Sequence, residues 1–368
     1  MSATTSVKAY GNLIGGEWVS AAETVPDINP AHTDQVLGLF PRSDASAVEA
    51  AIAAAADAFP RWRAMPMPAR GAILYKAADL LEARLDEVAR ALTQEEGKTF
   101  AESRGETARG VSILRYFAAE AMQPVGEVYP SASASTFLYT TRQPLGVVGL
   151  ITPWNFPVAI PLWKLAPALV YGNTVVLKPA ELTPLTAWLI AETLQQAGLP
   201  PGVLNVVFGR GSVIGDVLVN SPRVAAISFT GSNAVGRRIH DAATARGAKV
   251  QCEMGGKNPV IVMPDADLDQ AVELTISGAM RSTGQKCTAT SRAIVFAELA
   301  AAFTERLIER ARSIRVGDGM DPETYMGPLV SEEQRRTVLD YIQIGQSEGA
   351  RLAWGGQALE DGPYREGY

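Results

Sequence analysis

Short apolar runs alternate with amphipathic segments through the middle of the chain. The apolar runs predict buried strands at residues 146–152, 173–177, 204–208, 225–230 and 249–253. Apolar residues at three- and four-residue spacing predict the helices between them, at 161–171, 183–197, 213–219 and 234–245. Strands that alternate with helices favour an α/β fold whose parallel sheet is covered on both faces. With right-handed crossovers the sheet is doubly wound, and its ligand crevice lies at the carboxyl ends of the strands.

The segment before this sheet is mainly helical. Residues 11–19 predict a short hairpin with Gly15 and Gly16 in its turn. Long amphipathic helices follow, and they are predicted from Ser43 to about Phe59, over 69–94 and over 99–122. We expect these helices to serve as scaffold.

Two further features complete the predicted organisation. Residues 124–143 predict a protruding β-hairpin, and an exposed ribbon of this kind is suited to pairing with another subunit. After Gly255 and Gly256 a second α/β unit is predicted, with strands at 258–263 and 291–296 and helices at 268–280, capped by Asp265 or Asp267, and at 299–314. The chain therefore divides into residues 1–123 with 144–254, the hairpin 124–143, and a second domain at 255–368.

Composition narrows the range of functions. The 368 residues, 47% hydrophobic and 20% charged, are typical of a soluble protein of two domains. A net charge of −6 without a basic run argues against nucleic acid or an anionic membrane as partner. Residues 1–15 lack a secretory signal, and the apolar stretch 145–160 is broken by Pro153 and Pro157, so no membrane span is predicted. Two cysteines cannot form a disulfide framework, which favours the cytoplasm.

The histidine count removes several mechanisms. His32 and His240 are the only two histidines, so a His-rich metal site is excluded, and no cysteine pair has zinc-ligand spacing. We therefore expect no metal. A Cys/His hydrolase would need one of these histidines beside Cys287, and this alternative stays open at the level of sequence.

Polar residues directly follow two of the predicted strands. In Thr-Pro-Trp-Asn-Phe-Pro, residues 152–157, Asn155 is held on a rigid turn, where its amide could donate to a developing oxyanion or satisfy its own turn. Lys178 and Glu181 follow the next strand. A cation and a carboxylate at such an edge could hold the hydroxyls of a ribose, or form a solvated loop pair.

Two more junctions lie at the same predicted edge. Residues 228–236 form a strand–glycine–helix junction, and helix N-terminal amides favour phosphate, although the glycine pattern is not G-x-G-x-x-G. Glu253 ends another strand, where a carboxylate could serve as general base. Its neighbour Cys252 is interpreted as packing.

Cys287 lies in the loop Gly-Gln-Lys-Cys-Thr, between a predicted helix and a predicted strand. A free cysteine is most often a small buried hydrophobe. Here, however, a carboxylate, an oxyanion donor and a nucleotide cradle are expected at the adjoining sheet edge. Together with a thiol these are the parts needed for covalent oxidation of an aldehyde to a carboxylate through a thiohemiacetal and a thioester.

Five motifs carry a family resemblance: P-W-N-F-P, L-K-P-A-E, F-T-G-S, E-M-G-G-K and G-Q-K-C. In this order and spacing the chain resembles the aldehyde dehydrogenase superfamily from Gly15 to its end. The resemblance implies a Rossmann variant for the NAD(P)-binding domain, 1–123 with 144–254, an oligomerisation hairpin, and a catalytic domain at 255–368. It also implies Cys287 as nucleophile, Glu253 as general base for deacylation, and Asn155 with the Cys287 amide as oxyanion hole.

The same resemblance implies a cofactor site. The expected contacts are Thr152, Pro153, Trp154, Lys178, Glu181, Gly211, Phe229, Thr230, Gly231, Ser232, Met254 and Gly255. Glu181 would repel a 2′-phosphate, so NAD is favoured over NADP.

Substrate specificity rests on fewer residues. Arg281 precedes Cys287 by six residues, where succinic semialdehyde dehydrogenases carry an arginine that holds the distal carboxylate; a second arginine of that group is replaced here by Trp163. Residues 284–292 are similar to enzymes for α-ketoglutaric semialdehyde (2,5-dioxopentanoate). We therefore expect that acidic semialdehyde as substrate, bound by Arg281, Phe156 and Trp163, with succinic semialdehyde or a broad aldehyde range as alternatives. Arg281 could instead be a helix-end cation.

The resemblance also bears on the end of the chain. Members of the superfamily continue past the point that Tyr368 reaches, with a strand, an E-I-F-G-P segment and a terminal strand that pairs across a dimer. We therefore expect a C-terminally truncated chain with an incomplete second domain, either a fragment of a longer enzyme or a non-catalytic nucleotide-binding remnant. The full-length protein is expected to be a homodimer or homotetramer.

Overall fold

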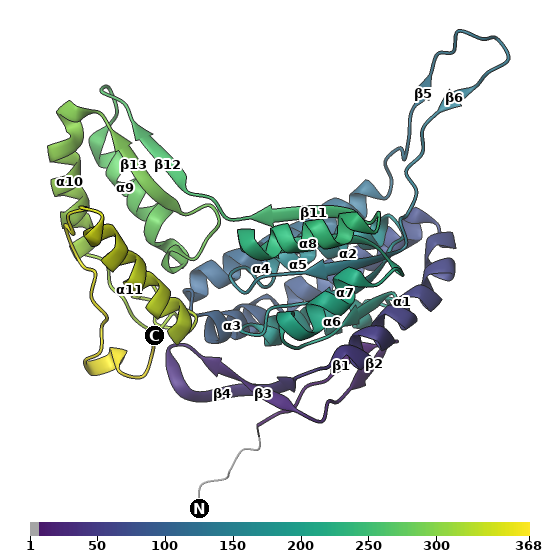
Figure 1. The fold of residues 1–368 in the computed structure, drawn as a ribbon, viewed down its shortest axis with the longest axis horizontal. Coiled ribbons are helices and arrows are strands. Elements are labelled where there is room, and N and C mark those ends of the chain that lie inside the picture. The colour runs from purple at the N-terminus through teal and green to yellow at the C-terminus, as the bar shows by residue number, and fades with distance from the viewer. Residues whose placement is uncertain (1–6) are drawn as a thin grey trace, which may run out of the picture.

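The computed structural model describes residues 7–368, and its main feature is a seven-stranded sheet (Figure 1). The strand order is β11-β10-β7-β8-β9-β1-β2. The strands are β1 (Asn12–Ile14), β2 (Glu17–Val19), β7 (Val147–Ile151), β8 (Thr174–Lys178), β9 (Leu204–Val206), β10 (Val224–Gly231) and β11 (Lys249–Met254). The first six residues of the predicted first domain lie outside the described residues.

The sheet is parallel where the sequence predicts it and antiparallel at one edge. Strands β7 to β11 pair in parallel, which confirms the predicted α/β sheet. The hairpin at 11–19 joins the same sheet, because β1 pairs antiparallel with both β9 and β2. A turn as short as Gly15–Gly16 can only return the chain antiparallel, so the predicted hairpin gives the parallel sheet an antiparallel edge, a placement that the sequence did not predict.

Helices cover both faces of the sheet. One face packs on α2 (Met67–Ala83), α3 (Leu85–Glu96), α4 (Phe100–Glu120), α5 (Ala159–Val170) and α6 (Pro184–Gln196). The other packs on α1 (Ala45–Ala64), α7 (Asp216–Asn220) and α8 (Asn233–Ala245). Alternation along β7 explains both cores, since Val148 and Leu150 point to the first and Val147 and Ile151 to the second.

Several predicted helix boundaries were wrong. The helix predicted to end at Phe59 continues through Pro60 to Ala64, because the buried Trp62 anchors the turn beyond the proline. The helix predicted over 69–94 is two helices, which break at Arg84, where the backbone leaves the helical region (φ −105°, ψ 15°). The predicted helix 213–219 is a π-helical turn at Gly211–Gly215 that leads into α7.

A pair of strands in the N-terminal region was not predicted. Strands β3 (Thr24–Asn29) and β4 (His32–Pro41) form an antiparallel hairpin. Pro26, Pro30 and Pro41 lie in or beside these strands, and proline normally argues against a strand. Their two-stranded sheet tolerates the prolines because no third strand needs the missing N–H groups.

The second α/β unit contains two parallel strands, β12 (Asn258–Val262) and β13 (Thr290–Val295). They pack with α9 (Leu268–Met280), which Asp267 rather than Asp265 caps, and with α10 (Ala297–Arg312). Short 3₁₀ turns occur at Arg281–Gly284 and Gly362–Tyr364. Helix α11 (Glu332–Ser347) was not predicted, although Ser331 and Gln334 have the spacing of a capping box and Ser331 caps it.

The hairpin predicted at 124–143 projects away from the rest of the chain (Figure 1). Its strands are β5 (Val128–Tyr129) and β6 (Leu138–Tyr139), and the large side chains of Phe137 and Tyr139 are exposed. The element is confirmed, and its pairing with another subunit stays a prediction. Among residues 7–368, no helix is both long and apolar enough to cross a bilayer.

Candidate functional site

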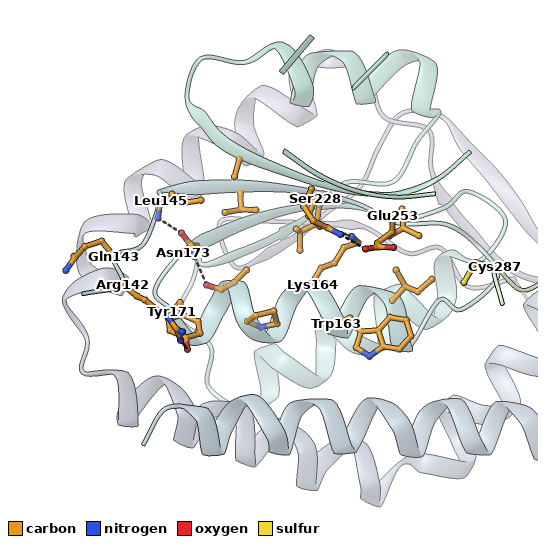
Figure 2. A pocket seen from close by; sticks show the side chains of 18 residues that line it. Arg142, Gln143, Leu145, Trp163, Lys164, Tyr171, Asn173, Ser228, Glu253 and Cys287 are labelled. Carbon is orange, nitrogen blue, oxygen red and sulfur yellow. Dashed lines mark hydrogen bonds between the residues drawn. The ribbon is translucent and has the colours of Figure 1, made fainter. Parts of the chain in front are cut away.

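A cavity of about 900 Å³ lies beside the sheet and is lined by both Cys287 and Glu253 (Figure 2). Figure 2 shows Cys287 near one end of it, Glu253 and Lys164 between, and Arg142 near the opposite end. The full lining is Arg142, Gln143, Leu145, Val148, Leu150, Ile160, Trp163, Lys164, Pro167, Ala168, Tyr171, Asn173, Ala226, Ser228, Thr230, Gln251, Glu253 and Cys287. The nucleophile and general base predicted from separate motifs therefore share one cavity.

Alternation along β11 separates the chain's two thiols. Gln251 and Glu253 line the cavity, whereas Cys252 between them faces the opposite core and lies 3.7 Å from the carbonyl oxygen of Gly236. Burial raises the pKa of the Cys252 thiol. Cys287 is exposed at its loop. The packing interpretation of Cys252 and the reactive interpretation of Cys287 thus agree with their positions.

Glu253 belongs to a hydrogen-bonded chain of side chains that the sequence did not predict. Gln251 Nε2 donates to Glu253 Oε1 at 3.0 Å, and Gln251 Oε1 accepts from the hydroxyl of Ser228. Lys164 Nζ donates to Ser228 Oγ at 2.7 Å and to Gln251 Oε1 at 3.3 Å. Burial lowers the pKa of Lys164 to about 8, against the opposing effect of Glu253. Sequence reasoning could have singled out Lys164, because it is the lone lysine in the otherwise apolar helix α5.

Asn155 connects the strand-end turn to the cysteine loop. Its side-chain Nδ2 donates to the carbonyl oxygen of Gln285 at 2.9 Å. An amide carries two N–H donors, so one remains for an oxyanion after this bond is made. Its Oδ1 is buried and has no hydrogen-bond partner among the described residues. The predicted oxyanion donor therefore lies beside the loop that carries Cys287.

The cysteine loop is held by residues that were not among the predicted site. Asn258 Nδ2 donates to the carbonyl oxygens of Cys287 (2.7 Å) and Ala289 (3.1 Å). Gln285 Oε1 accepts from the backbone N–H of Val330 at 3.1 Å. These bonds hold the loop through the Gln285 side chain before the thiol and through the backbone at Cys287 and Ala289, so the loop is tied to β12 and to the segment before α11.

Lys178 and Gly211 form one side of the expected cofactor cradle. Lys178 is buried at the end of β8, and its Nζ donates to the carbonyl oxygen of Pro179 at 2.8 Å. Burial lowers the pKa of Lys178, and the nearby carboxylate of Glu181 opposes this shift. A Cβ atom on Gly211 would lie 3.8 Å from Lys178 Nζ, so the glycine leaves space beside the ammonium group. The remaining N–H donors of the Lys178 ammonium group and the exposed carboxylate of Glu181 fit the hydroxyls of a ribose.

The N-terminus of α8 forms the other side. Ser232 caps the helix through a 3.5 Å bond from Val235 N, and the first-turn amides have no acceptor within the helix. A Cβ on Gly231 would come within 2.5 Å of the Phe229 ring, so only glycine fits there. The Met254 side chain likewise packs so closely on Gly236 that a Cβ atom there would clash with it. Such a helix end suits a pyrophosphate.

The remaining predicted contacts lie in varied surroundings. Thr152 is buried and its Oγ1 has no hydrogen-bond partner within residues 7–368, Pro153 and Trp154 are half-buried, and Gly255 is exposed. Thr230 lines the cavity described above.

The three predicted substrate contacts are not brought together. Trp163 lines the cavity and is 45% exposed. The Phe156 ring packs on the first core, with the Lys98 ammonium 4.0 Å from its centroid. Arg281 is not among the lining residues, and its guanidinium lies 5.1 Å from the centroid of the Tyr325 ring.

Neither histidine is near Cys287. His32 bonds to Asp318 (3.0 Å) and Glu366 (3.3 Å), and the exposed His240 lies beside Asp241. The cavity lining contains no histidine, so a Cys/His hydrolase has no support. In the part of the chain that the structure describes, no group of three or more His, Cys, Asp or Glu side chains could hold a metal ion.

Comparison with known proteins gives a consistent result for the whole chain. The model of the Aldehyde dehydrogenase family matches residues 18–368. An α-ketoglutaric semialdehyde dehydrogenase of Bacillus subtilis (strain 168) is 52% identical over 370 residues, which is 100% of this chain and 76% of that protein. A malonate-semialdehyde dehydrogenase of Geobacillus kaustophilus is 41% identical, over 96% of this chain and 73% of that protein.

Solved structures agree with the sequence comparison. PnpE in complex with nicotinamide adenine dinucleotide is 39% identical, with a TM-score of 0.94 over 97% of this chain and 74% of that one. An NADP dependent enzyme of E. coli is also 39% identical, with a TM-score of 0.92 over 96% of this chain and 73% of that one.

Proposed function

The chain belongs to the aldehyde dehydrogenase family and is an enzyme of that class, and from this premise we propose that it oxidises α-ketoglutaric semialdehyde to the carboxylate. The observation that carries the proposal is the shared cavity of Cys287 and Glu253, with Asn155 bonded to the cysteine loop. Nucleophile, base and oxyanion donor come from three distant motifs, and this arrangement serves acyl transfer through a thioester.

In the first step the Cys287 thiolate attacks the aldehyde carbon. A carbon–sulfur bond forms, and the carbonyl electron pair moves to oxygen to give a thiohemiacetal oxyanion. The free N–H of Asn155 Nδ2 and the Cys287 amide would stabilise that charge. Bound NAD(P) would supply the oxidant that accepts the hydride from the former aldehyde carbon. The oxyanion then collapses to the Cys287 thioester.

In the second step Glu253 activates a water molecule. Its carboxylate takes the proton as the water oxygen attacks the thioester carbon, the carbon–sulfur bond breaks, and Cys287 leaves as thiolate. Gln251 donates to Glu253 Oε1, which leaves Oε2 as the basic oxygen. The product is the carboxylate, with no acyl acceptor other than water.

The cofactor is proposed to lie on Lys178, Glu181 and the N-terminus of α8. A buried ammonium with spare donors and an exposed carboxylate suit two ribose hydroxyls, and the Ser232-capped helix suits the pyrophosphate. Glu181 disfavours a 2′-phosphate, so we favour NAD over NADP. Relatives of known structure bind one or the other.

The substrate proposal rests on the 52% identical relative and on Arg281. An arginine six residues before the nucleophile could hold the distal carboxylate of an acidic semialdehyde by a paired hydrogen bond. Malonate semialdehyde, named for the relative at 41% identity, and succinic semialdehyde are shorter acids of the same class. Chain length is therefore the property that an assay must resolve.

We also propose a cytoplasmic homo-oligomer whose hairpin, residues 124–143, pairs with another copy. Two free thiols fit a reducing compartment. The exposed Phe137 and Tyr139 on the projecting β5–β6 ribbon favour a protein contact.

The test follows formation of NADH or NADPH by the 368-residue chain with 2,5-dioxopentanoate, succinic semialdehyde, malonate semialdehyde and butanal, each with NAD and with NADP. We expect the highest kcat/KM with 2,5-dioxopentanoate and NAD, and loss of all activity in Cys287→Ala. Higher kcat/KM for another aldehyde would overturn the substrate assignment. Cofactor binding without turnover of any aldehyde would favour the non-catalytic alternative.

A further inference from the structure

The two loops that form the proposed oxyanion site both bind one short segment outside it. This segment comprises residues 98–106, the end of the α3–α4 connection and the first turns of α4; we call it the anchor segment. Neither the motifs nor the mechanism above assigns it a role. Two of its charged side chains are buried, since those of Lys98 and Glu106 are 1% and 2% exposed.

Lys98 holds the backbone of the Asn155 turn. Its Nζ donates to the carbonyl oxygen of Asn155 at 2.7 Å and to Glu106 Oε2 at 2.7 Å, and it lies over the Phe156 ring. Burial alone would lower the pKa of Lys98, but the Glu106 and Glu96 carboxylates raise it, so the group is charged. A charged ammonium that bonds to both groups fixes the peptide that carries the oxyanion donor.

Glu106 holds the other end of the same turn. Its Oε1 accepts from the backbone N–H groups of Val158 (2.9 Å) and Ala159 (3.0 Å), where α5 begins. The Lys98–Glu106 pair therefore hydrogen-bonds to the backbone both at Asn155 and three to four residues later. Such a clamp prevents the turn from sliding relative to α5.

Glu102 holds the loop that leads to Cys287. Its Oε1 accepts from the backbone N–H of Ser282 at 2.8 Å, while Oε2 accepts from Thr99 N (3.1 Å) and Thr99 Oγ1 (2.9 Å). Ser282 and Thr283 have φ values of 52° and 54°, the left-handed region that non-glycine residues seldom adopt. This strained backbone needs external bonds to persist, and Glu102 supplies one.

The two gripped loops also meet each other, through the bond from Asn155 Nδ2 to Gln285 O. The anchor segment, the Asn155 turn and the cysteine loop thus form a closed ring of hydrogen bonds. We propose that Lys98 with Glu106, and Glu102, are positioning residues that set the Asn155 donor against the Cys287 loop. The proposal rests on the function proposed above, because it concerns the same oxyanion site.

The contacts of Lys98 and Glu106 with the Asn155 turn are tested with the double variant Lys98→Met/Glu106→Gln. It removes the ammonium together with the Glu106 charge, and the glutamine oxygen can still accept from Val158 and Ala159. The buried Glu96, whose carboxyl lies 3.8 Å from the ammonium, loses that neighbour. We expect kcat for aldehyde oxidation to fall about 10- to 100-fold, as for a misplaced oxyanion donor, with KM within about threefold. Alkylation of Cys287 by iodoacetamide should keep its wild-type rate, because the thiol loop is untouched.

The contact of Glu102 with the loop that leads to Cys287 is tested by comparing Glu102→Leu with Glu102→Gln. The leucine variant loses the bond to Ser282 N, so we expect kcat to fall about 10-fold or more and the rate of Cys287 alkylation to change several-fold. The glutamine variant keeps an acceptor and should restore both values to within about threefold. Arg104→Met is the matched control, since this α4 residue makes only a surface ion pair with Asp86.

Both series are also measured by hydrolysis of 4-nitrophenyl acetate, which acylates Cys287 and releases 4-nitrophenolate without a hydride acceptor. If the wild type oxidises no aldehyde but hydrolyses this ester, the proposed oxidation is wrong. The rate of ester hydrolysis still measures the effect of the positioning residues. Circular dichroism and melting temperature check that each variant folds. Folded variants with wild-type kcat, equal losses in Glu102→Gln and Glu102→Leu, or a wild type without either activity would overturn the positioning proposal.

Discussion

The side-chain amide of Asn155 donates to the carbonyl oxygen of Gln285 at 2.9 Å, although 130 residues separate the two. Asn155 lies in the turn that follows β7, and Gln285 lies two residues before Cys287. The bond fixes the distance between the proposed oxyanion donor and the proposed nucleophile before any substrate arrives. Preorganisation of this kind is the source of most electrostatic stabilisation in enzymes.

Replacing Asn155 should therefore impair chemistry more than binding. In Asn155→Ala we expect kcat to fall about 10²- to 10³-fold, because a donor to the oxyanion is lost. Asn155→Asp is the matched variant of equal size, and it should lose as much because a carboxylate cannot donate. Steady-state assays of NADH formation measure both. A loss confined to KM would contradict the assigned role.

Glu253 should be needed for deacylation and not for acylation. In Glu253→Gln we expect a burst of NADH of about one equivalent per active site, followed by turnover at least about 10²-fold slower than wild type. Mass spectrometry of the quenched enzyme should show the acyl group on Cys287. Gln251→Leu removes the donor to Glu253 Oε1 and should give a smaller loss in the same step. An absent burst in Glu253→Gln would assign the residue to acylation instead.

Much of this site could be predicted because parallel strands bring their carboxyl ends to one edge. Lys178 and Glu253 lie at the carboxyl ends of their strands and Asn155 in the turn after β7, so their proximity follows from topology. Alternation along β11 could likewise assign Glu253 and Cys252 to opposite faces. These inferences need only the order and direction of elements.

The anchor residues could not be predicted in this way. Lys98, Glu102 and Glu106 precede or begin an amphipathic helix, where charged residues normally face solvent, and Lys98 is 57 residues from the carbonyl it holds. Only tertiary packing buries Lys98 and Glu106 and half-buries Glu102. Strands β3 and β4 were missed for a local reason, since their prolines mimic the signal of a loop.

Lys164 makes the free energy of unfolding of the protein depend on pH. Its pKa falls from the usual 10.5 to about 8 in the folded state, so burying the charged form costs stability. The unfolded chain binds more protons between pH 8 and 10.5, so this cost is full below pH 8 and disappears as pH rises to about 10.5. Lys164→Met should therefore raise the free energy of unfolding by about 1–2 kcal/mol at pH 7, after the loss of two hydrogen bonds.

Urea unfolding of wild type and Lys164→Met at pH 7, 8.5 and 10 measures this dependence. The advantage of the variant should shrink steadily along that series. An advantage that is constant with pH would show that packing, rather than the charge, makes the difference.

Arg281 should distinguish acidic aldehydes from neutral ones. If its guanidinium binds the distal carboxylate, Arg281→Ala loses a charge-assisted hydrogen bond, and kcat/KM for 2,5-dioxopentanoate should fall about 10- to 100-fold. Values for butanal should stay within about twofold, because that substrate has no carboxylate. The matched control is Arg310→Ala, since the guanidiniums of Arg281 and Arg310 lie 5.1 and 5.2 Å from the centroid of the same Tyr325 ring. If the two variants lose activity equally, or if butanal suffers as much as the acid, the arginine supports the Tyr325 region and does not select the substrate.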